Sequence, residues 1–597
     1  MNYKTIPEMF FSVVNSNPDK KILNYKFNDK WIGINGIELK DKVVSLASAL
    51  YSFDLDSQDK VAILSSTSYQ WALCDYSIVC SGMTTVTVYP TLAIDQVEFI
   101  LVNSEAKLIF VENIEQLNKI NKIYSSCDNL KHVIVMDDSI SNEHDYVNSL
   151  SELIEIGNKY KEKNNISIEN KIKSINPDDL VTLIYTSGTT GMPKGVMLSH
   201  NNLISNINEV SKLQKNLEKE IFLSFLPLSH VLERMAGHFF ALSINSKIYY
   251  AENMETVGEN MNEISPTVVV CVPRFFEKMY NKIIAGLNDG SENKKKIFNW
   301  ALKIGKDYTN IKHAKQSVPL NLKIKYKIAD MLIYGKVRSK LGGKIKFFIS
   351  GGAPLSTNIA EFFAGIGIII LEGYGLTETS PVLTSNTPED IRFGCVGRKL
   401  DNVELKIAKD GEILAKGPNI MLGYYKDEVA TKNVFDDDGW FHTGDIGVID
   451  NDGFLKITDR KKSLLVTSAG KNIAPAPLEN ALNSSKYIEQ CLVLGDKRNF
   501  ISALIVPNFD MVNHHLLSIN KDKLSNDAII DHPDVIILIN KEVSDSMNSF
   551  SSYETVKKYK LLSNQFSIEK GEMTPKMSIV RKKVIENYSD IIESIYK

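Results

Sequence analysis

The sequence predicts an α/β protein: a large N-terminal domain with mostly parallel sheets plus a small β-rich region, and a small α+β C-terminal domain. Three observations predict this organisation. Apolar, β-rich runs alternate with helix-like stretches along the first two thirds of the chain. After residue 400 the pattern changes to short strands with Gly- and Asp-rich turns, and a further segment beyond residue 460 has its own strand candidates. The 597 residues also exceed what a single hydrophobic core usually organises.

The alternating part of the chain contains eight short apolar runs, many of them separated by helix-like sequence. They are residues 61–65, 108–111, 132–136, 181–185, 221–226, 268–272, 347–350 and 368–372. Strands alternating with helical sequence indicate parallel sheets with helices on their faces. Several runs are apolar throughout, which is typical of strands covered on both sides.

The texture changes from Asp401 onward, where the strings KDGEI, DDDGW and DNDGF indicate tight turns between short strands. After the basic string DRKK at 459–462 come two more strand candidates, 491–494 and 502–506. We therefore expect one domain over 1–459 and a second over 460–597.

Composition excludes several classes of protein. The net charge of −3 argues against a nucleic-acid-binding protein. The six cysteines are scattered, without CxxC pairs or zinc-ligand spacing, which favours a reduced, cytoplasmic compartment. The N-terminus does not look like a signal peptide, and no run approaches the roughly 20 apolar residues of a membrane-spanning helix.

Residues 291–346 are strongly basic, with 15 Lys and Arg against three acidic residues. Within this segment Ile324, Ile328, Met331 and Leu332 fall on one face of a helix. Two interpretations stay open: a solvated helical surface, or a basic amphipathic face that makes a peripheral contact with anionic membrane lipid.

The strongest functional signal is the string YTSGTTGMPKG at 185–195, directly after a predicted strand. Glycines let backbone N–H groups approach phosphate oxygens, while Ser and Thr hydroxyls and a lysine add donors and positive charge. The string lacks the G-x-x-x-x-G-K-[ST] order of the Walker loop. The candidate nucleotide-binding residues here are Thr186, Ser187, Gly188, Thr189, Thr190, Gly191 and Lys194.

A second string, EGYGLTET at 372–379, follows the predicted strand at 368–371. The carboxyl ends of strands are where α/β folds collect ligands. Tyr374 offers a ring to stack on a base, Thr377 offers a donor to a phosphate, and Glu378 offers a hard oxygen ligand to Mg²⁺.

Together the two strings resemble the adenylate-forming enzymes, which include acyl-CoA synthetases, luciferases and the adenylation domains of peptide synthetases. The resemblance implies adenine stacking by Tyr374, an α-phosphate contact and catalytic role for Thr377, and metal binding by Glu378 with Thr190 of the phosphate loop. Other strings occur in the family's order. They imply acyl and adenine contacts at Gly352 and Ala353 (SGGAPL), ribose binding by Asp445 (WFHTGD), a nucleotide contact at Arg460 and a mobile C-terminal domain hinged near Lys462 (DRKK).

Residues 226–234 (LPLSHVLER), 272–280 (VPRFFEKMY) and 470–475 (GKNIAP) resemble long-chain fatty acyl-CoA synthetases. This resemblance implies that ATP, with Mg²⁺, activates a long-chain fatty acid to acyl-AMP, and that CoA then accepts the acyl group. His230 is a candidate for lining or gating the acyl channel, and an ordinary packing role for it stays open.

The C-terminal segment departs from the family's pattern. The family usually has a catalytic lysine shortly before a basic pair, and alignment on Thr574-Pro575 and the basic run puts Ser578 at that position. Lys576 lies two residues earlier and would share a face with that position in an extended strand. Three alternatives stay open: Lys576 substitutes, adenylation is weakened, or the segment is a solvated charge cluster. Ser463 also stands where relatives often have an acidic residue.

Two other classes of function remain open beside the synthetase. One is an acyl-AMP ligase that delivers to a carrier protein, although no carrier domain is attached and the only Leu-Gly-Gly, at 341–343, is followed by Lys344 rather than serine. The other is a degenerate nucleotide- or lipid-binding module, which Ser578 alone favours.

Overall fold

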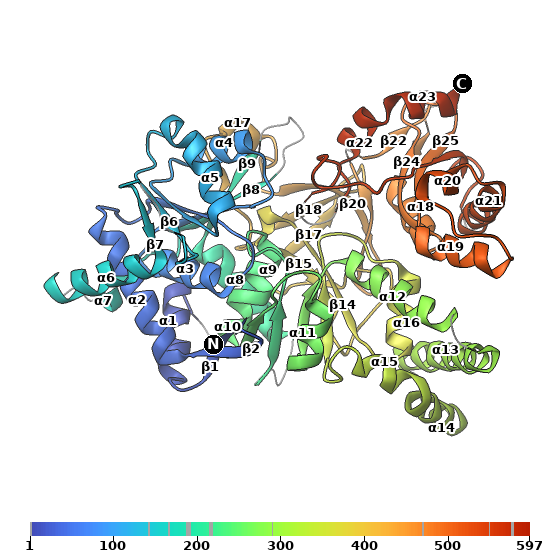
Figure 1. Ribbon diagram of the computed structural model, residues 1–597, viewed down its shortest axis with the longest axis horizontal. Helices are drawn as coiled ribbons and strands as arrows, with labels where there is room; N and C mark the ends of the chain where they lie inside the picture. The colour runs from blue at the N-terminus through green and yellow to red at the C-terminus, as the bar shows by residue number, and fades with distance from the viewer. Residues whose placement is uncertain are drawn as a thin grey trace.

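The computed structural model describes residues 3–140, 144–164, 168–186, 193–213, 219–288, 291–461, 463–468, 471–548, 550–574 and 578–597. In Figure 1 the N-terminal sheets and their helices form the larger mass, and the C-terminal segment, drawn in orange and red, forms a separate lobe beside them.

The first large sheet has eight strands in the described part of the chain. In spatial order they are β19 (Gly423–Tyr424), β9 (Lys194–Ser199), β8 (Leu180–Thr186), β4 (Thr84–Val88), β3 (Lys60–Leu64), β5 (Leu108–Val111), β6 (His132–Val135) and β7 (Val147–Ser149). The strands from β8 to β7 are parallel, and β9 and β19 extend the sheet with antiparallel pairings.

The second large sheet has nine strands among the described residues. Their order is β16 (Arg398–Lys399), β15 (Val382–Ser385), β14 (Ile370–Gly375), β13 (Phe347–Ser350), β12 (Val268–Cys271), β10 (Ile221–Ser224), β11 (Lys247–Tyr250), β1 (Lys21–Phe27) and β2 (Lys30–Asn35). The pairings from β14 to β1 are parallel, and the outer ones are antiparallel. All eight predicted runs are strands, so the predicted α/β class with mostly parallel sheets is confirmed.

Burial on both faces explains why these strands are apolar throughout. In β3, Val61 and Ile63 point into the core that the two large sheets share with helices α1 (Ile6–Ser16), α2 (Gly36–Ser52), α3 (Tyr69–Cys80) and α8 (His200–Lys212). Ala62 and Leu64 point the other way, toward α4 (Ile94–Ser104) and α5 (Ile114–Ile123). Because side chains alternate along a strand, a strand with two covered faces needs apolar residues at every position.

The predicted β-rich region is a four-stranded antiparallel sheet. Its order is β17 (Glu404–Ile407), β18 (Glu412–Lys416), β20 (Phe441–Ile449) and β21 (Leu455–Arg460). Its small core includes Val403, Ile413 and Leu455, and it also contains Tyr374 of β14. This packing brings the middle of β20, at Asp445, next to Tyr374 of the nine-stranded sheet.

The C-terminal lobe is built on a three-stranded sheet of β24 (Ile488–Leu494), β25 (Ile501–Pro507) and β26 (Val556–Leu561). Helices α18 (Pro475–Asn483), α19 (Phe509–Ser518) and α21 (Pro533–Met547) pack on one face, together with the small β22 (Leu465–Val466) and β23 (Asn472–Ile473) pair. Helices α22 (Arg581–Asn587) and α23 (Ser589–Tyr596) pack on the other. This lobe therefore has its own two-sided core.

Helices lie on either side of β13 in the sequence. Those that precede it are α12 (Pro273–Asn288), α13 (Glu292–His313), α14 (Leu320–Ala329), η3 (Asp330–Tyr334) and α15 (Gly335–Ser339), and α16 (Thr357–Gly365) follows it. In Figure 1, α14 lies at the outer edge of the molecule, beyond α13 and α15. Among the helices that the structure describes, none is long and apolar enough to cross a membrane.

The remaining helices are short or cap the sheets. They are η1 (Tyr124–Ser126), α6 (Leu150–Asn164), α7 (Ile168–Ile172), α9 (Val231–Glu233), η2 (Arg234–Phe240), α10 (Ala241–Ser243), α11 (Val257–Ile264), η4 (Thr377–Thr379), α17 (Glu428–Lys432) and α20 (Asn526–Ile530).

Candidate active site

Three of the predicted nucleotide-binding residues meet where β14 approaches the four-stranded sheet. The Tyr374 hydroxyl donates to Asp445 Oδ2 over 2.7 Å, and Arg460 Nε donates to Asp445 Oδ1 over 3.1 Å. Asp445 and Arg460 lie opposite each other on β20 and β21, so the strand pairing itself brings them together. Tyr374 lies inside β14, because this strand continues through Gly375 instead of ending at residue 372 as the sequence predicted.

Burial dominates the electrostatics of this group. It raises the pKa of the Asp445 carboxyl above its usual value, and the neighbouring Arg460 guanidinium opposes that rise. Burial, together with the Asp445 charge, also raises the pKa of Tyr374 well above its usual range, so this phenol remains a donor. Asp445 therefore offers two acceptor oxygens, held in place by donors on either side, as expected of a group that binds a pair of hydroxyls.

A second group lies around Glu378, in the short 3₁₀ turn η4 that follows β14. The Tyr424 hydroxyl donates to Glu378 Oε1 over 2.9 Å, and Lys194 Nζ lies 5.1 Å from the centre of the Tyr424 ring. Burial and the nearby Glu378 carboxylate raise the pKa of Tyr424, which keeps its hydroxyl protonated. Tyr424 thus links the predicted metal ligand to the predicted phosphate-loop lysine.

Tyr424 is a site residue that the sequence did not predict. It lies in the edge strand β19, where Gly423 and Tyr424 pair with Met197 and Val196 of β9. Its string, Gly-Tyr-Tyr, has no composition that marks phosphate or metal chemistry, and only the strand pairing places it beside Glu378.

Of the phosphate-loop candidates, the structure describes Thr186 and Lys194. They face each other as the last pair of the antiparallel β8–β9 ladder. Ser187, Gly188, Thr189, Thr190 and Gly191 lie outside the described residues. Of the two described residues, Lys194 lies on the side of Glu378, with the Tyr424 ring between them.

The loop after β13 lies beside β14. A side chain at Gly351 would sit 3.3 Å from Leu232 and 3.7 Å from the Gly373 carbonyl oxygen, and Gly352 has φ +82°, a conformation that favours glycine. Gly352 and Ala353 are exposed at this edge. Burial raises the pKa of the nearby Glu372 to about 8, which favours a protonated carboxyl at neutral pH.

His230 has a definite local role at the start of α9. Its Nδ1 accepts the Leu232 N–H over 3.2 Å and so caps this short helix. Two residues later, Leu232 lies so close to Gly351 that a side chain there would meet it at 3.3 Å. The capping bond favours the structural interpretation of His230, and its channel-lining role stays a proposal.

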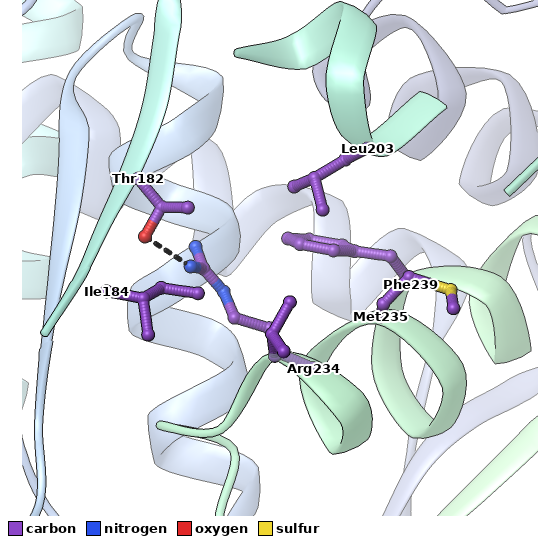
Figure 2. Close-up of a pocket in the computed structure, with 7 residues that line it drawn as sticks. Thr182, Ile184, Leu203, Arg234, Met235 and Phe239 are labelled. Carbon is purple, nitrogen blue, oxygen red and sulfur yellow. Dashed lines mark hydrogen bonds between the residues drawn. The ribbon is translucent and has the colours of Figure 1, made fainter. Parts of the chain in front are cut away.

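The rest of the string at 226–234 enters the core. Arg234 begins the π-helix η2, and its guanidinium donates to both oxygens of Asp75 and, over 2.6 Å, to Thr182 Oγ1. Burial disfavours ionisation of Asp75, but Arg234 and His238 outweigh it and hold the pKa of Asp75 at about 2. Figure 2 shows Arg234 pointing toward Thr182 beside Leu203 and Phe239.

Arg234, Thr182, Leu203 and Phe239 are among the residues that line a narrow void of about 160 Å³, no part of which is wide enough for a water molecule. Ion pairing and hydrogen bonding satisfy Arg234 and Asp75 inside the core, where an unpaired charge would be strongly destabilising. This part of the string therefore joins η2 to the eight-stranded sheet and does not form a ligand pocket.

Glu233, also in this string, is buried, and only a hydrogen bond from Ser224 opposes the effect of burial on its carboxyl group. Its Oε1 accepts from Ser224 Oγ over 2.6 Å, and burial raises its pKa from 4.5 to about 8. As pH rises above 4.5 the unfolded chain loses this proton while the folded chain keeps it, so Glu233 costs increasing stability until about pH 8.

We expect Glu233→Gln to stabilise the protein more at pH 8 than at pH 5, by up to about 1.4 kcal/mol for each pH unit between the two pKa values. Urea unfolding at pH 5, 6.5 and 8 measures this difference. The exposed Glu569→Gln is the matched control and should show no such trend. A stability gain that is the same at all three pH values would contradict the prediction.

The predicted catalytic Lys576 and the predicted hinge Lys462 lie outside the described residues. Flanking Lys576, the Thr574 N–H donates to the Ser578 carbonyl over 2.8 Å, and Met573 pairs antiparallel with Ile579. Met573 and Ile579, the described residues on either side of this position, therefore face each other. The role of Lys576 remains a proposal.

Among the described residues, no group of three or more His, Cys, Asp and Glu side chains could hold a metal ion by itself. Glu378 thus contributes a single carboxylate at this edge. That is enough for a metal ion that takes most of its remaining ligands from the phosphates of a bound nucleotide.

The family model described as "AMP-binding enzyme" matches residues 10–425, and the model described as "AMP-binding enzyme C-terminal domain" matches residues 462–597. Two curated relatives are long-chain-fatty-acid–CoA ligases. That of Mycobacterium bovis is 34% identical, over 100% of this chain and 97% of its own length, and that of Xenopus laevis is 31% identical, over 99% and 84%.

Solved structures agree in fold. The adenylation domain of a carboxylate reductase from Mycobacterium chelonae superposes with a TM-score of 0.74 at 22% identity, covering 99% of this chain and 91% of that one. The family match spans most of both lobes, and the relatives match along nearly their whole length. The chain therefore belongs to the AMP-binding, adenylate-forming enzyme family, alongside members named long-chain-fatty-acid–CoA ligases, and the family prediction made from its motifs is confirmed.

Proposed function

We propose that this enzyme uses ATP to convert a long-chain fatty acid to acyl-AMP and then transfers the acyl group to CoA. The observation that carries the proposal is the convergence of Tyr374, Asp445 and Arg460 beside the Glu378–Tyr424 pair. These residues would form a nucleotide site, and two relatives that match nearly all of this chain are named long-chain-fatty-acid–CoA ligases.

The two groups of residues would contact different parts of ATP. The Tyr374 ring would contact adenine, Asp445 would accept the ribose hydroxyls, and Thr377 and Lys194 would contact the phosphates. The residues present also fit Mg²⁺, since Glu378 is a half-buried carboxylate oriented by Tyr424. Glu378, with Thr190, would hold the ion, which neutralises the phosphate charge when bound.

In the first step a carboxylate oxygen of the fatty acid attacks the α-phosphorus of ATP. The bond from this phosphorus to the bridging oxygen breaks, and pyrophosphate leaves. In the second step the CoA sulfur attacks the acyl carbonyl, the thiol proton is released, and AMP departs. Pyrophosphate leaves in the first step and AMP in the second, and both are good leaving groups, so neither step requires a serine or cysteine nucleophile from the protein.

We propose that the C-terminal domain turns about Lys462 between these steps, which would admit CoA and exclude water from acyl-AMP. The preceding residue, Lys461, is held by Asp410 and Glu412 over 2.7 and 2.8 Å, which supports a boundary directly after it. Arg274 of α12 pairs with Glu489 of β24 over 2.5 Å, so a large rotation would have to break this contact.

The proposal is tested by identifying the nucleotide product. The purified protein is incubated with ATP, Mg²⁺, CoA and a series of acids from acetate to oleate. We expect AMP and acyl-CoA to form with long-chain acids, and AMP to accumulate only when CoA is present.

The same assay separates the other functions. Acyl-AMP that accumulates with no acyl-CoA formed, even when CoA is present, would favour a ligase that delivers to a carrier protein. An absence of AMP with every acid would favour the degenerate binding module, and ADP as the product would exclude adenylation altogether.

We expect Lys576→Ala to slow formation of acyl-AMP by on the order of a hundredfold, because a lysine charge at the α-phosphate stabilises the charge that develops during attack. Thioester formation from preformed acyl-AMP should change much less. Rapid-quench measurement of each half-reaction tests the prediction.

Lys570→Ala, which removes an exposed lysine from the same segment, is the matched control. Equal slowing of both half-reactions by Lys576→Ala would argue against its role as the lysine missing at position 578.

We also propose that residues 291–346 make a peripheral contact with a membrane.

A further inference from the structure

The continuous helical segment formed by α14 and η3 is anchored on one side by aromatic residues. The rings of Tyr308 and Tyr326 stack with centres 4.0 Å apart, which joins α14 to α13. The hydroxyl of the buried Tyr334 donates to the Ala301 carbonyl of α13. These contacts settle which side of the segment faces the protein.

The opposite side exposes large apolar residues. Leu320 and Met331 are 73% and 72% exposed, respectively. Ile324, Ile328 and Leu332 belong to the same face and are 52%, 42% and 38% exposed. Leu320, Ile324 and Ile328 lie four residues apart along α14, and Met331 and Leu332 continue this exposed apolar stripe into the π-helix η3. A stripe of this kind is energetically unfavourable in water and marks a surface that another phase or molecule covers.

Lysines lie on both flanks of this stripe. Lys323, Lys325 and Lys327 are exposed, and none of them forms an ion pair among the residues that the structure describes. Asp330, the acidic residue of the same helical segment, forms an ion pair with Arg338 over 2.6 Å. The positive charge beside the stripe is therefore not neutralised by the protein's own carboxylates.

We propose that the outer face of α14 and η3 docks on an anionic lipid bilayer, with Leu320, Ile324, Ile328, Met331 and Leu332 inserted at the interface and the flanking lysines at the headgroups. An apolar stripe between unpaired cations is the composition of a helix that lies in the plane of a membrane surface. Clustered lysines are attracted to anionic headgroups, whereas they would repel the same lysines of a second copy of this chain.

Vesicle flotation tests the proposal without requiring turnover, so its outcome is independent of the proposed activity. Wild-type protein is mixed with vesicles of phosphatidylcholine alone, or with vesicles of phosphatidylcholine that contain about 30% phosphatidylglycerol. We expect flotation with the anionic vesicles, a loss of flotation as salt is raised because charges are screened, and little flotation with neutral vesicles.

Two variants separate the apolar and electrostatic contributions. Leu320→Asp/Met331→Asp removes the two most exposed apolar anchors, and Lys323→Glu/Lys325→Glu/Lys327→Glu reverses the flanking charge. Each should lower the membrane partition coefficient by on the order of tenfold or more. The matched control is Val429→Asp/Ile537→Asp, which makes the same change at positions that are 72% and 67% exposed elsewhere, and it should float like the wild type.

Thermal unfolding establishes that each variant is folded, and sedimentation without lipid reports its oligomeric state. Wild-type protein that fails to float with anionic vesicles overturns the proposal. So does flotation that none of the α14 variants weakens. A wild-type dimer that Leu320→Asp/Met331→Asp converts to a monomer, with no effect of either variant on flotation, would assign this face to a second copy of the chain instead.

Discussion

Replacing Glu378 with alanine should reduce ATP–pyrophosphate exchange by on the order of a hundredfold or more at ordinary Mg²⁺ concentrations. A metal ion at the transferring phosphates contributes several kcal/mol of charge stabilisation, and Glu378 is the carboxylate that we propose to hold it. Exchange of labelled pyrophosphate into ATP, measured across a range of Mg²⁺ concentrations, tests the prediction. A requirement for more Mg²⁺ in the variant would tie the loss to the metal rather than to folding.

Tyr424→Phe is the matched control for this variant. It keeps the ring beside Lys194 and the Glu378 carboxylate, and it removes the hydroxyl that donates to Glu378. Because one neutral donor to a carboxylate contributes about 1.5–3 kcal/mol at most, we expect a smaller loss than for Glu378→Ala. Undiminished exchange in Glu378→Ala would remove this residue from the metal site.

The second large effect is expected for Asp445→Ala, which should raise the KM for ATP by about ten- to a hundredfold. The variant removes both acceptor oxygens that we propose for the ribose hydroxyls, and a total loss of about 1.5–3 kcal/mol, the range for hydrogen bonding to a charged acceptor, corresponds to a change of this size. Steady-state kinetics with ATP, fatty acid and CoA varied in turn provide the measurement. The KM values for fatty acid and CoA should change little.

Tyr374→Phe separates the ribose contact from the adenine contact. It retains an aromatic ring and removes only the hydroxyl bond to Asp445, so we expect ATP binding to weaken less than in Asp445→Ala. If Asp445→Ala lowers the thermal stability and leaves the KM for ATP unchanged, Asp445 serves only to join β20 to β21 through Arg460. A larger effect of Tyr374→Phe than of Asp445→Ala would contradict the proposed division of roles.

Much of the fold could be predicted because its strands are buried on both faces. A run such as 108–111 has no polar position, and this pattern is nearly independent of the strands that pair with it. Strand ends were less predictable. The run at 368–372 extends to Gly375 as β14, because β15 supplies antiparallel partners for Gly373, Tyr374 and Gly375 that lie later in the chain.

The site was predictable where its chemistry is concentrated in a short string. The residue types in EGYGLTET and YTSGTTGMPKG indicate base, metal and phosphate binding directly. The role of Asp445 follows from the order of motifs in the family. Tyr424 was missed, since its contact with Glu378 depends on the pairing of β19 with β9. The raised pKa of Glu233 could not be predicted, because it depends on burial by residues that are distant in the sequence.

The sequence by itself determined the α/β class, the family and the chemical types of the nucleotide-binding residues, because strand burial and phosphate recognition are local properties of short segments. The tertiary structure decided which of these residues touch and what covers each face. Periodicity put Ile324, Ile328, Met331 and Leu332 on one helix face, but only the packing of α14 on α13 through Tyr326 leaves that face exposed. Hydrophobic period reports which side chains share a surface, whereas the partner of that surface depends on residues distant in the chain.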